Sequence, residues 1–167
     1  HVYDKQLFAN GGVDWRKQGM VSPVKNQGQC GGSALFNIVD ALDSANAIKT
    51  GMLTELSMQQ IIDCDDKIMG CSGGFPDDIW SYVLKNGLES VNDYPTTGRA
   101  GTCHYNASEV AVKVKSVEKV TDKKVSSLEA AITKEPTLVG VDVSTQMQMY
   151  TSGIFDDENC GTQINSF

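Results

Sequence analysis

A chain of 167 residues is long enough for one ordinary domain, or for two small lobes that share an interface. Its net charge of −7 argues against nucleic acid and membranes as partners, because contacts to phosphate groups need clustered Lys and Arg. Hydrophobic residues make up 40% of the chain, the mean hydropathy is −0.24, and no apolar run approaches the ~20 residues of a membrane-spanning helix. We therefore expect a globular protein with no nucleic-acid partner and no membrane partner.

Three helices are predicted in the first half of the chain. Apolar residues recur at helical spacing over residues 33–49, which predicts a first helix. A second helix is predicted to begin at Ser57, because Ser57-x-x-Gln60 has the spacing of a capping box. The third is predicted over residues 76–86, with Pro at its first turn and Gly87 as its stop. Its predicted inward residues are Ile79, Trp80, Val83 and Leu84.

After the first hundred residues the sequence changes to patterns typical of strands. Valines alternate with Ala and Lys over residues 110–115, which predicts a half-exposed strand. A short helix is predicted over residues 127–134, with Ser126 as its cap. Residues 138–143 predict a mostly buried strand, and residues 153–155 predict the start of another. Helices first and strands later indicate an α+β protein with two segregated lobes.

Five cysteines are scattered along the chain, and the two histidines, His1 and His104, lie far apart in the sequence. The cysteines are Cys30, Cys64, Cys71, Cys103 and Cys160. They do not form the paired CxxC sets typical of structural zinc, so we expect no metal and no cofactor. Scattered cysteines favour disulfides and an oxidising compartment, and their odd number leaves one over.

Two further features bear on whether the protein is secreted. The chain opens on the polar residues 1–5, so no leader is visible and a secreted protein would be present in processed form. Asn106-Ala107-Ser108 is an acceptor pattern for N-glycosylation, a modification of secreted proteins. Such triplets also arise by chance, so both interpretations of Asn106 stay open.

The central stretch of the chain is residues 27–36, where a Gly-rich turn that carries a cysteine runs directly into the first predicted helix. Backbone N–H groups at a helix N-terminus are unpaired and carry partial positive charge, so this position stabilises an anion. A thiol there would be acidified into a nucleophile. In this chain the thiol lies one turn early, at Cys30, and Ser33 occupies the predicted helix start.

Together these segments resemble the papain family (cathepsin L-like) of cysteine proteases. The matching blocks follow the family's order and are residues 14–16, 21–28, 30–34, 56–64, 70–76, 94–95, 150–155 and Cys160. The resemblance covers residues 13–166 and implies a papain-like two-lobe α+β fold. Residues 18–117 would form a complete helical left lobe. Residues 1–17 together with 118–167 would form a strand-rich right lobe that is truncated at the C-terminus.

The resemblance also implies how the cysteines pair. It implies the disulfides Cys30–Cys71 and Cys64–Cys103, and an unpaired Cys160 whose partner would lie in a C-terminal segment that this chain does not contain. The alternative for Cys160 is an ordinary buried free cysteine. In the chain-entropy model, closing loops of roughly 40 residues contributes about 4 kcal/mol for each disulfide.

The chain departs from the family at its catalytic positions. Ser33 occupies the nucleophile position, and Ala34 stands where the family has a bulky aromatic residue. Ser166 occupies the position of the general-base histidine. An alcohol needs a base within about 2.6–3.2 Å, and Ser166 cannot accept a proton near neutral pH. His104 adjoins Cys103 and is expected to be a surface histidine rather than a substitute base.

Parts of the family's binding apparatus persist. Gln27 matches the side-chain donor of the oxyanion hole, and Gly73 and Gly74 match the segment whose backbone pairs with an extended peptide. The residues that match the walls of the pocket for the substrate's second side chain are Phe75, Pro76, Gly140 and Ile164. A structural alternative is that Gln27 hydrogen-bonds its own loop, and that the two glycines serve a disulfide-linked turn with positive φ.

The sequence therefore supports two hypotheses on activity, and a further possibility is that residues 1–167 are a processed or truncated fragment of a longer inactive protein. The first is a catalytically inactive papain-like homologue, a pseudoprotease with a binding, storage or regulatory role. The alternative is a papain-family peptidase that is active through Ser33 or completed by a missing C-terminal chain. Expected partners are a peptide or protein ligand in the interlobe cleft, and a second chain or homo-oligomer that covers the truncated lobe. The expected location is extracellular, as a secreted protein, or the lysosome or vacuole.

Overall fold

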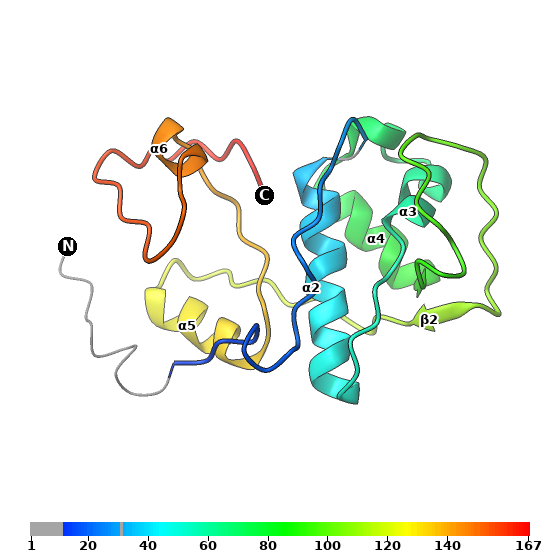
Figure 1. Cartoon of the computed structure of the whole chain (residues 1–167), viewed down its shortest axis with the longest axis horizontal. Coiled ribbons are helices and arrows are strands. Elements are labelled where there is room, and N and C mark those ends of the chain that lie inside the picture. The colour runs from blue at the N-terminus through cyan, green and yellow to red at the C-terminus, as the bar shows by residue number, and fades with distance from the viewer. Residues whose placement is uncertain (1–11, 31) are drawn as a thin grey trace. The chain divides into compact units, whose positions relative to one another are not determined.

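The computed structural model describes residues 12–30 and 32–167, which divide into two compact units. The first lies within His1–Thr137 and the second is Leu138–Phe167. Figure 1 shows the helices and strands, and those of the first unit are α2 (Ser33–Thr50), α3 (Met58–Cys64), the short 3-10 helix η1 (Gly70–Ser72), α4 (Pro76–Asn86), β1 (Leu88–Glu89), β2 (Val110–Val112) and α5 (Val125–Lys134). The second unit contains α6 (Thr145–Gln148).

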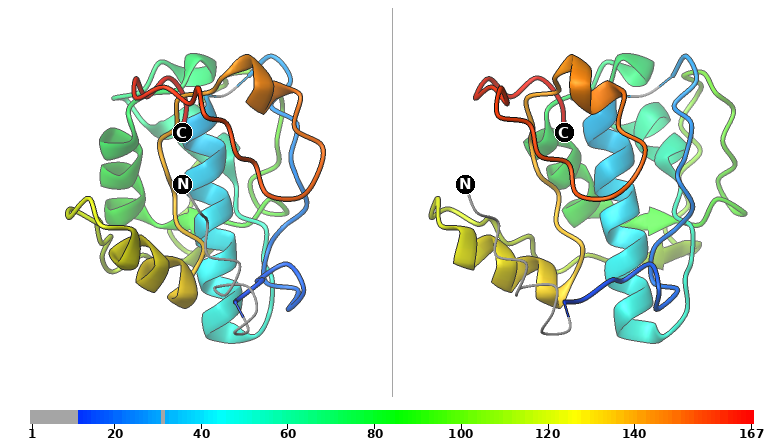
Figure 2. Two further views of the ribbon diagram at one scale, coloured as in Figure 1. Left: turned by 90° about the vertical axis from the view of Figure 1, so that its left-hand side faces the viewer. Right: turned by 60° about the vertical axis from the view of Figure 1, so that its left-hand side comes forward.

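Helix α2 is the centre of the first unit and confirms the first predicted helix. It ends at Gly51, whose φ of 78° is left-handed and whose N–H donates to the Ala47 carbonyl at 2.7 Å. Its apolar face is buried, with Leu35 and Ile38 fully inaccessible. The views in Figure 2 show α4 lying along α2, which accounts for that burial. Neither α2 nor any other helix of the described residues is long and apolar enough to cross a bilayer.

Helix α3 begins as predicted, but only half of the predicted capping box forms. The Ser57 hydroxyl accepts a hydrogen bond from the Gln60 N–H at 3.1 Å. The Gln60 side chain does not return the bond, because the Ser57 N–H already donates to the Glu89 carbonyl at 2.9 Å. Instead the buried Gln60 amide donates to the Tyr82 hydroxyl and the Gly87 carbonyl, and accepts from the Glu89 N–H. Gln60 therefore joins α3 to α4 and β1.

Helix α4 confirms the third predicted helix, including its start at Pro76 and its stop at Gly87, where φ is 73°. The prediction of its inward face was partly wrong. Ile79 and Val83 are fully buried, but Leu84 is 41% exposed and Trp80 is half-buried. Tyr82 takes the inward position, because its hydroxyl accepts a hydrogen bond from the Gln60 amide at 3.1 Å.

The two strands of the first unit form a small antiparallel sheet in which Leu88 lies opposite Val112 and Glu89 opposite Val110. The predicted alternation is confirmed for β2, where the valines are half-buried and Ala111 is exposed. This sheet closes over α3, because Leu88 and Glu89 are both buried and the Gln60 side chain accepts the Glu89 N–H.

The later part of the chain differs most from prediction. The strands expected at 138–143 and 153–155 were wrong, because the described residues there contain only one isolated bridge, between Val141 and Ser166. The described part of the chain is thus α+β with few strands, and residues 138–167 are not strand-rich. The cap predicted at Ser126 was also wrong, since α5 begins at Val125, and Lys124 precedes it without a side-chain cap.

Candidate functional site

The start of α2 directly follows the Gly-rich turn that carries Cys30. Gly32 is the N-cap in extended conformation, and it makes no side-chain cap hydrogen bond. The first turn contains no acidic residue, and Ser33 is its first, half-buried residue. The partial positive charge of the N–H groups at this helix start therefore acts at Ser33 and favours an anion there.

A disulfide and two glycines place a second segment beside this helix start. The Cys30–Cys71 disulfide holds the two Cα atoms 4.3 Å apart. Gly73 has a φ of +71°, and a Cβ there would lie 3.0 Å from the Gly32 Cα. Only glycine satisfies both the conformation and the contact. At Gly74 a Cβ would overlap the Ile68 side chain at 2.5 Å.

The structure thus brings the predicted peptide-pairing segment next to Ser33. The structural alternative, a turn with positive φ, is confirmed for Gly73 but not for Gly74, which is not among the positive-φ glycines. Phe75 follows this segment with 76% of its surface exposed, and Pro76 opens α4.

Gln27 lies in a tight turn just before the disulfide. Its carbonyl accepts the Cys30 N–H at 3.2 Å, and Gly28, with φ 57°, donates its N–H to the Asn26 side chain at 2.8 Å. Within the described residues the Gln27 side chain makes no hydrogen bond, so the alternative that it bonds its own loop is not supported. It lines a pocket of about 400 Å³ that Phe36 and Met58 also line.

Lys25 anchors this loop to α2, and sequence analysis missed it. Its ammonium contacts the Asp40 carboxylate at 2.5 Å and the Asp43 carboxylate at 3.0 Å. The other Asp43 oxygen accepts the Leu56 N–H at 2.9 Å, and Asp43 is fully buried. The available signal was an acidic pair three residues apart on the predicted helix, with one member among its apolar positions.

The two carboxylates that contact Lys25, those of Asp40 and Asp43, keep the lysine in its charged form. Burial by itself lowers the pKa of Lys25, but the hydrogen bonds and charges of Asp40 and Asp43 outweigh it and raise the pKa above its usual value. Burial also raises the pKa of Asp43, against the opposing effect of Lys25. Lys25 is therefore an ammonium at neutral pH and cannot accept a proton from Ser33.

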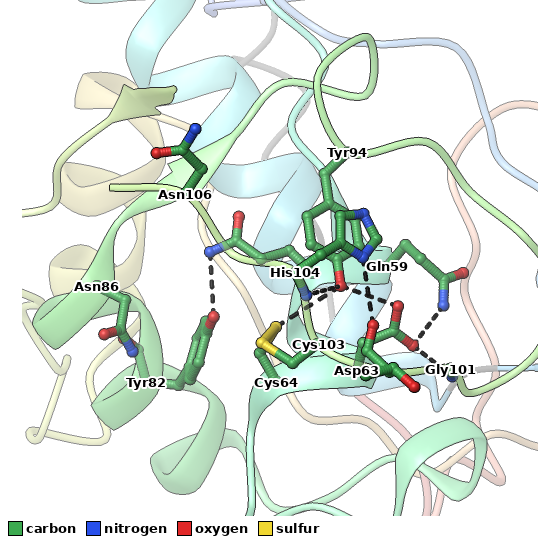
Figure 3. Close-up of a disulfide and its surroundings, with 12 residues drawn as sticks. Gln59, Asp63, Cys64, Tyr82, Asn86, Tyr94, Gly101, Cys103, His104 and Asn106 are labelled. Atoms are coloured by element: carbon green, nitrogen blue, oxygen red, sulfur yellow. Dashed lines mark hydrogen bonds between the residues drawn. A yellow bond between two sulfur atoms is a disulfide. The ribbon is translucent and has the colours of Figure 1, made fainter. Parts of the chain in front are cut away.

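His104 is an exposed residue at the second disulfide, Cys64–Cys103, as Figure 3 shows. Its ring stacks on Tyr94 with centroids 3.7 Å apart, and its Nδ1 lies 3.2 Å from the Thr102 carbonyl. The surface position expected for this histidine is confirmed. No group of three or more His, Cys, Asp or Glu side chains within residues 12–30 and 32–167 could hold a metal ion.

Tyr94 organises the contacts around this disulfide. Its hydroxyl donates to the Asp63 carboxylate at 3.0 Å and lies 3.6 Å from the Cys64 sulfur. Burial raises the pKa of Tyr94 to about 12, so it is a neutral phenol at physiological pH. The carboxylate of Asp63 also accepts the Gly101 N–H and the Gln59 amide, and the Gly101 bond holds the segment between β1 and β2 against α3.

The remaining predicted site residues lie in the second unit. A Cβ on Gly140 would be 3.0 Å from the Ile164 side chain, so these two residues are neighbours. Ser166 is half-buried and pairs its backbone with Val141. Cys160 is a free and exposed cysteine, so the alternative of a buried cysteine was wrong.

Comparisons with known proteins agree with one another. Residues 9–167 match the profile of the papain family cysteine proteases. Caricain from Carica papaya is 40% identical over 157 residues, which are 92% of this chain and 44% of caricain. Zingipain-1 from Zingiber officinale is 37% identical over 157 residues, which are 93% of this chain and 71% of zingipain-1.

Solved structures give the same result. The bromelain protease from Ananas comosus, in complex with the E64 inhibitor, matches with a TM-score of 0.83 and 35% identity, over 92% of this chain and 71% of that one. The digestive procathepsin L2 proteinase from Tenebrio molitor matches with a TM-score of 0.82 and 36% identity, over 93% of this chain and 50% of that one. The chain thus has a papain-like fold and spans less than half the length of caricain. Sequence and fold together show that the chain belongs to the papain family of cysteine proteases.

Proposed function

We propose that this chain is a catalytically inactive papain-family protein that acts through binding, storage or regulation. The observation that carries the proposal is the position of His104, whose ring is stacked on Tyr94 at the Cys64–Cys103 disulfide. The other histidine, His1, lies outside the described residues. The sequence places Ser166, rather than a histidine, at the family position of the general base.

The chemistry of Ser33 supports the same proposal. A helix N-terminus acidifies a thiol enough to ionise it, but an alcohol starts from a far higher pKa and needs a general base. Lys25, in the neighbouring loop, is held as an ammonium by two carboxylates. Ser166, at the family position of the base, carries a hydroxyl that does not accept a proton near neutral pH.

The proposed ligand is an extended segment of a peptide or protein. Gly73 and Gly74 offer backbone groups for strand addition, and the exposed Phe75 offers an apolar contact beside them. Gln27 adds an amide without a hydrogen-bond partner in the described part of the chain. These groups bind a peptide without needing to cleave it.

The compartment follows from the disulfides. Two are formed in a chain of 167 residues, and such bonds persist in oxidising environments. We propose that the protein is secreted or resides in the lysosome or vacuole.

The test of inactivity is labelling by a fluorophosphonate, an electrophile that reacts with activated serine hydroxyls. We expect the intact protein to gain no mass at Ser33 under conditions that label an active serine hydrolase fully. Since Cys160 is a free and exposed thiol, the experiment uses a Cys160→Ser variant to remove it. Stoichiometric labelling of Ser33 in that variant would favour the alternative, a peptidase active through Ser33.

A further inference from the structure

Asn106 lies in an exposed turn that follows the Cys64–Cys103 disulfide and precedes β2. It begins the single Asn-x-Ser/Thr triplet of the 167-residue sequence, and Ser108 completes that triplet. In Figure 3 the Asn106 side chain stands apart from the drawn hydrogen bonds around the disulfide.

Hydrogen bonds within the turn place the two polar side chains of the triplet together. The Asn106 Oδ1 accepts from the Ser108 hydroxyl at 2.7 Å and from the Ser108 N–H at 3.1 Å. The Glu109 N–H donates to the Asn106 carbonyl at 3.0 Å and closes the turn. The Asn106 Nδ2 has no hydrogen-bond partner within the described residues, so a substituent on this nitrogen displaces no contact there.

The backbone of the turn is held from the other side by a buried carboxylate. Glu89 is 1% exposed, and its side chain accepts the Asn106 N–H at 2.8 Å. Its strand, β1, pairs with β2. The backbone of Asn106 is therefore fixed to the core while its side chain is exposed, which allows the folded protein to carry a large polar group there.

We propose that Asn106 is an N-glycosylation site, with a lipid-linked oligosaccharide as the donor. In the transfer the Asn106 Nδ2 attacks the anomeric carbon of an oligosaccharide joined to a polyprenyl diphosphate. The new bond joins Nδ2 to that carbon, the bond from the carbon to the diphosphate oxygen breaks, and Nδ2 loses one proton. The inference rests on the secretory location proposed above, and it is independent of whether the protein cleaves peptides.

The test is translation of the full chain, behind a cleavable secretion leader, in the presence of endoplasmic reticulum microsomes. The expected result is one glycan on the translocated chain, seen as an upward gel shift that peptide N-glycosidase removes. Asn106→Gln and Ser108→Ala are expected to abolish the shift, and Ser108→Thr is expected to keep it. Asn86→Gln is the matched control, because Asn86 precedes Gly-Leu and belongs to no such triplet.

A protease-protected chain without the shift, beside a control glycoprotein that does shift, would overturn the assignment. So would a shift that survives Asn106→Gln. Peptide cleavage by the glycosylated product would instead overturn the proposal of inactivity and leave Asn106 as the glycan site. The readout is the modification itself, so it does not depend on how stably each variant folds.

Discussion

Asp43 is the most constrained single residue near the proposed site. Asp43 is fully buried within α2. Its carboxylate binds the Lys25 ammonium and accepts the Leu56 N–H, so it joins α2 to the segments before and after the helix. Removing Asp43 would leave the Lys25 ammonium with the part-exposed Asp40 carboxylate and would leave the buried Leu56 N–H without its acceptor, which is strongly destabilising. The loop that carries Gln27 therefore depends on this carboxylate.

We expect Asp43→Ala to lower the free energy of unfolding by about 3 kcal/mol, measured by urea denaturation. Asp40→Ala is the matched control and should cost about 1 kcal/mol or less, because the Asp40 side chain is 32% exposed and screened by solvent. Equal losses in the two variants would contradict the assignment of Asp43 as the buried anchor.

The raised pKa of Tyr94, which lies beside the Cys64–Cys103 disulfide, predicts that the stability of the protein depends on pH. The pKa of Tyr94 rises from 10.0 to about 12 on folding, chiefly through burial. The folded state thus holds this proton more tightly, so the stabilisation is fully present below pH 10 and is lost as the pH rises toward 12. The loss amounts to about 2 kcal/mol.

The measurement is urea unfolding of the wild-type protein and of Tyr94→Phe between pH 8 and about pH 12. Tyr82 and Lys25 also titrate at high pH but are present in both proteins, so their contributions cancel in the difference. The stability difference between the two proteins should shrink across this window. A difference that stays constant with pH would contradict the raised pKa of Tyr94.

Among the elements, α3 shows most clearly which local signals hold. We expect Ser57→Ala to destabilise the protein by about 1–2 kcal/mol, because its hydroxyl caps α3 and also donates to the Tyr94 carbonyl at 2.7 Å. Ser126→Ala should be neutral in the same thermal or urea unfolding experiment, since the structure does not use Ser126 as a cap. A comparable loss of stability in Ser126→Ala would contradict the structure and support the cap that the sequence predicted at Ser126.

The contrast between α4 and residues 138–143 explains how far sequence could predict the elements. Helix α4 is specified by neighbours in sequence, such as Pro76 at its start and Gly87 at its stop, and both were predicted correctly. A strand forms only when its backbone pairs with another strand, which can lie far away in the sequence. Within the described chain, residues 138–143 make only the isolated bridge between Val141 and Ser166. The apolar content of residues 138–143 therefore predicted a strand, but the structure has no partner strand paired with it in the described residues.

The candidate site also has a part that could be predicted from the sequence and a part that depends on long-range contacts. The motif around Cys30 and Ser33, and the pairing of the cysteines, came from the resemblance to a family rather than from spacing. The Lys25 and Asp43 contact depends on how a loop folds back onto α2, so the acidic pair on the helix could not by itself identify Lys25 as its partner. The Gln60 side chain was assigned to a cap but bridges α3, α4 and β1, because a buried amide binds whichever groups the fold presents.

For the whole molecule, the exposed apolar side chains of residues 138–167 predict association. Met149 is 77% exposed, Ile154 is 64% exposed and Ile164 is 61% exposed. Burying such surface against a second copy or a partner chain is favourable. We expect the chain to form dimers or larger species in a sedimentation-velocity concentration series.

The double variant Ile154→Ser/Ile164→Ser should shift that distribution toward the monomer. Val24→Ser is the matched control, because Val24 is fully exposed but lies in the first unit. A wild-type protein that stays monomeric and stable at all concentrations would contradict the prediction.

The proposal of an inactive papain-family protein has one most direct test, the cleavage of a fluorogenic peptide substrate by the wild-type protein and by Ser33→Ala. Because Ser166 stands at the family position of the general-base histidine, we predict that both proteins give the same background rate at every pH from 4 to 9. A wild-type rate clearly above that of Ser33→Ala would contradict the account and identify Ser33 as a working nucleophile.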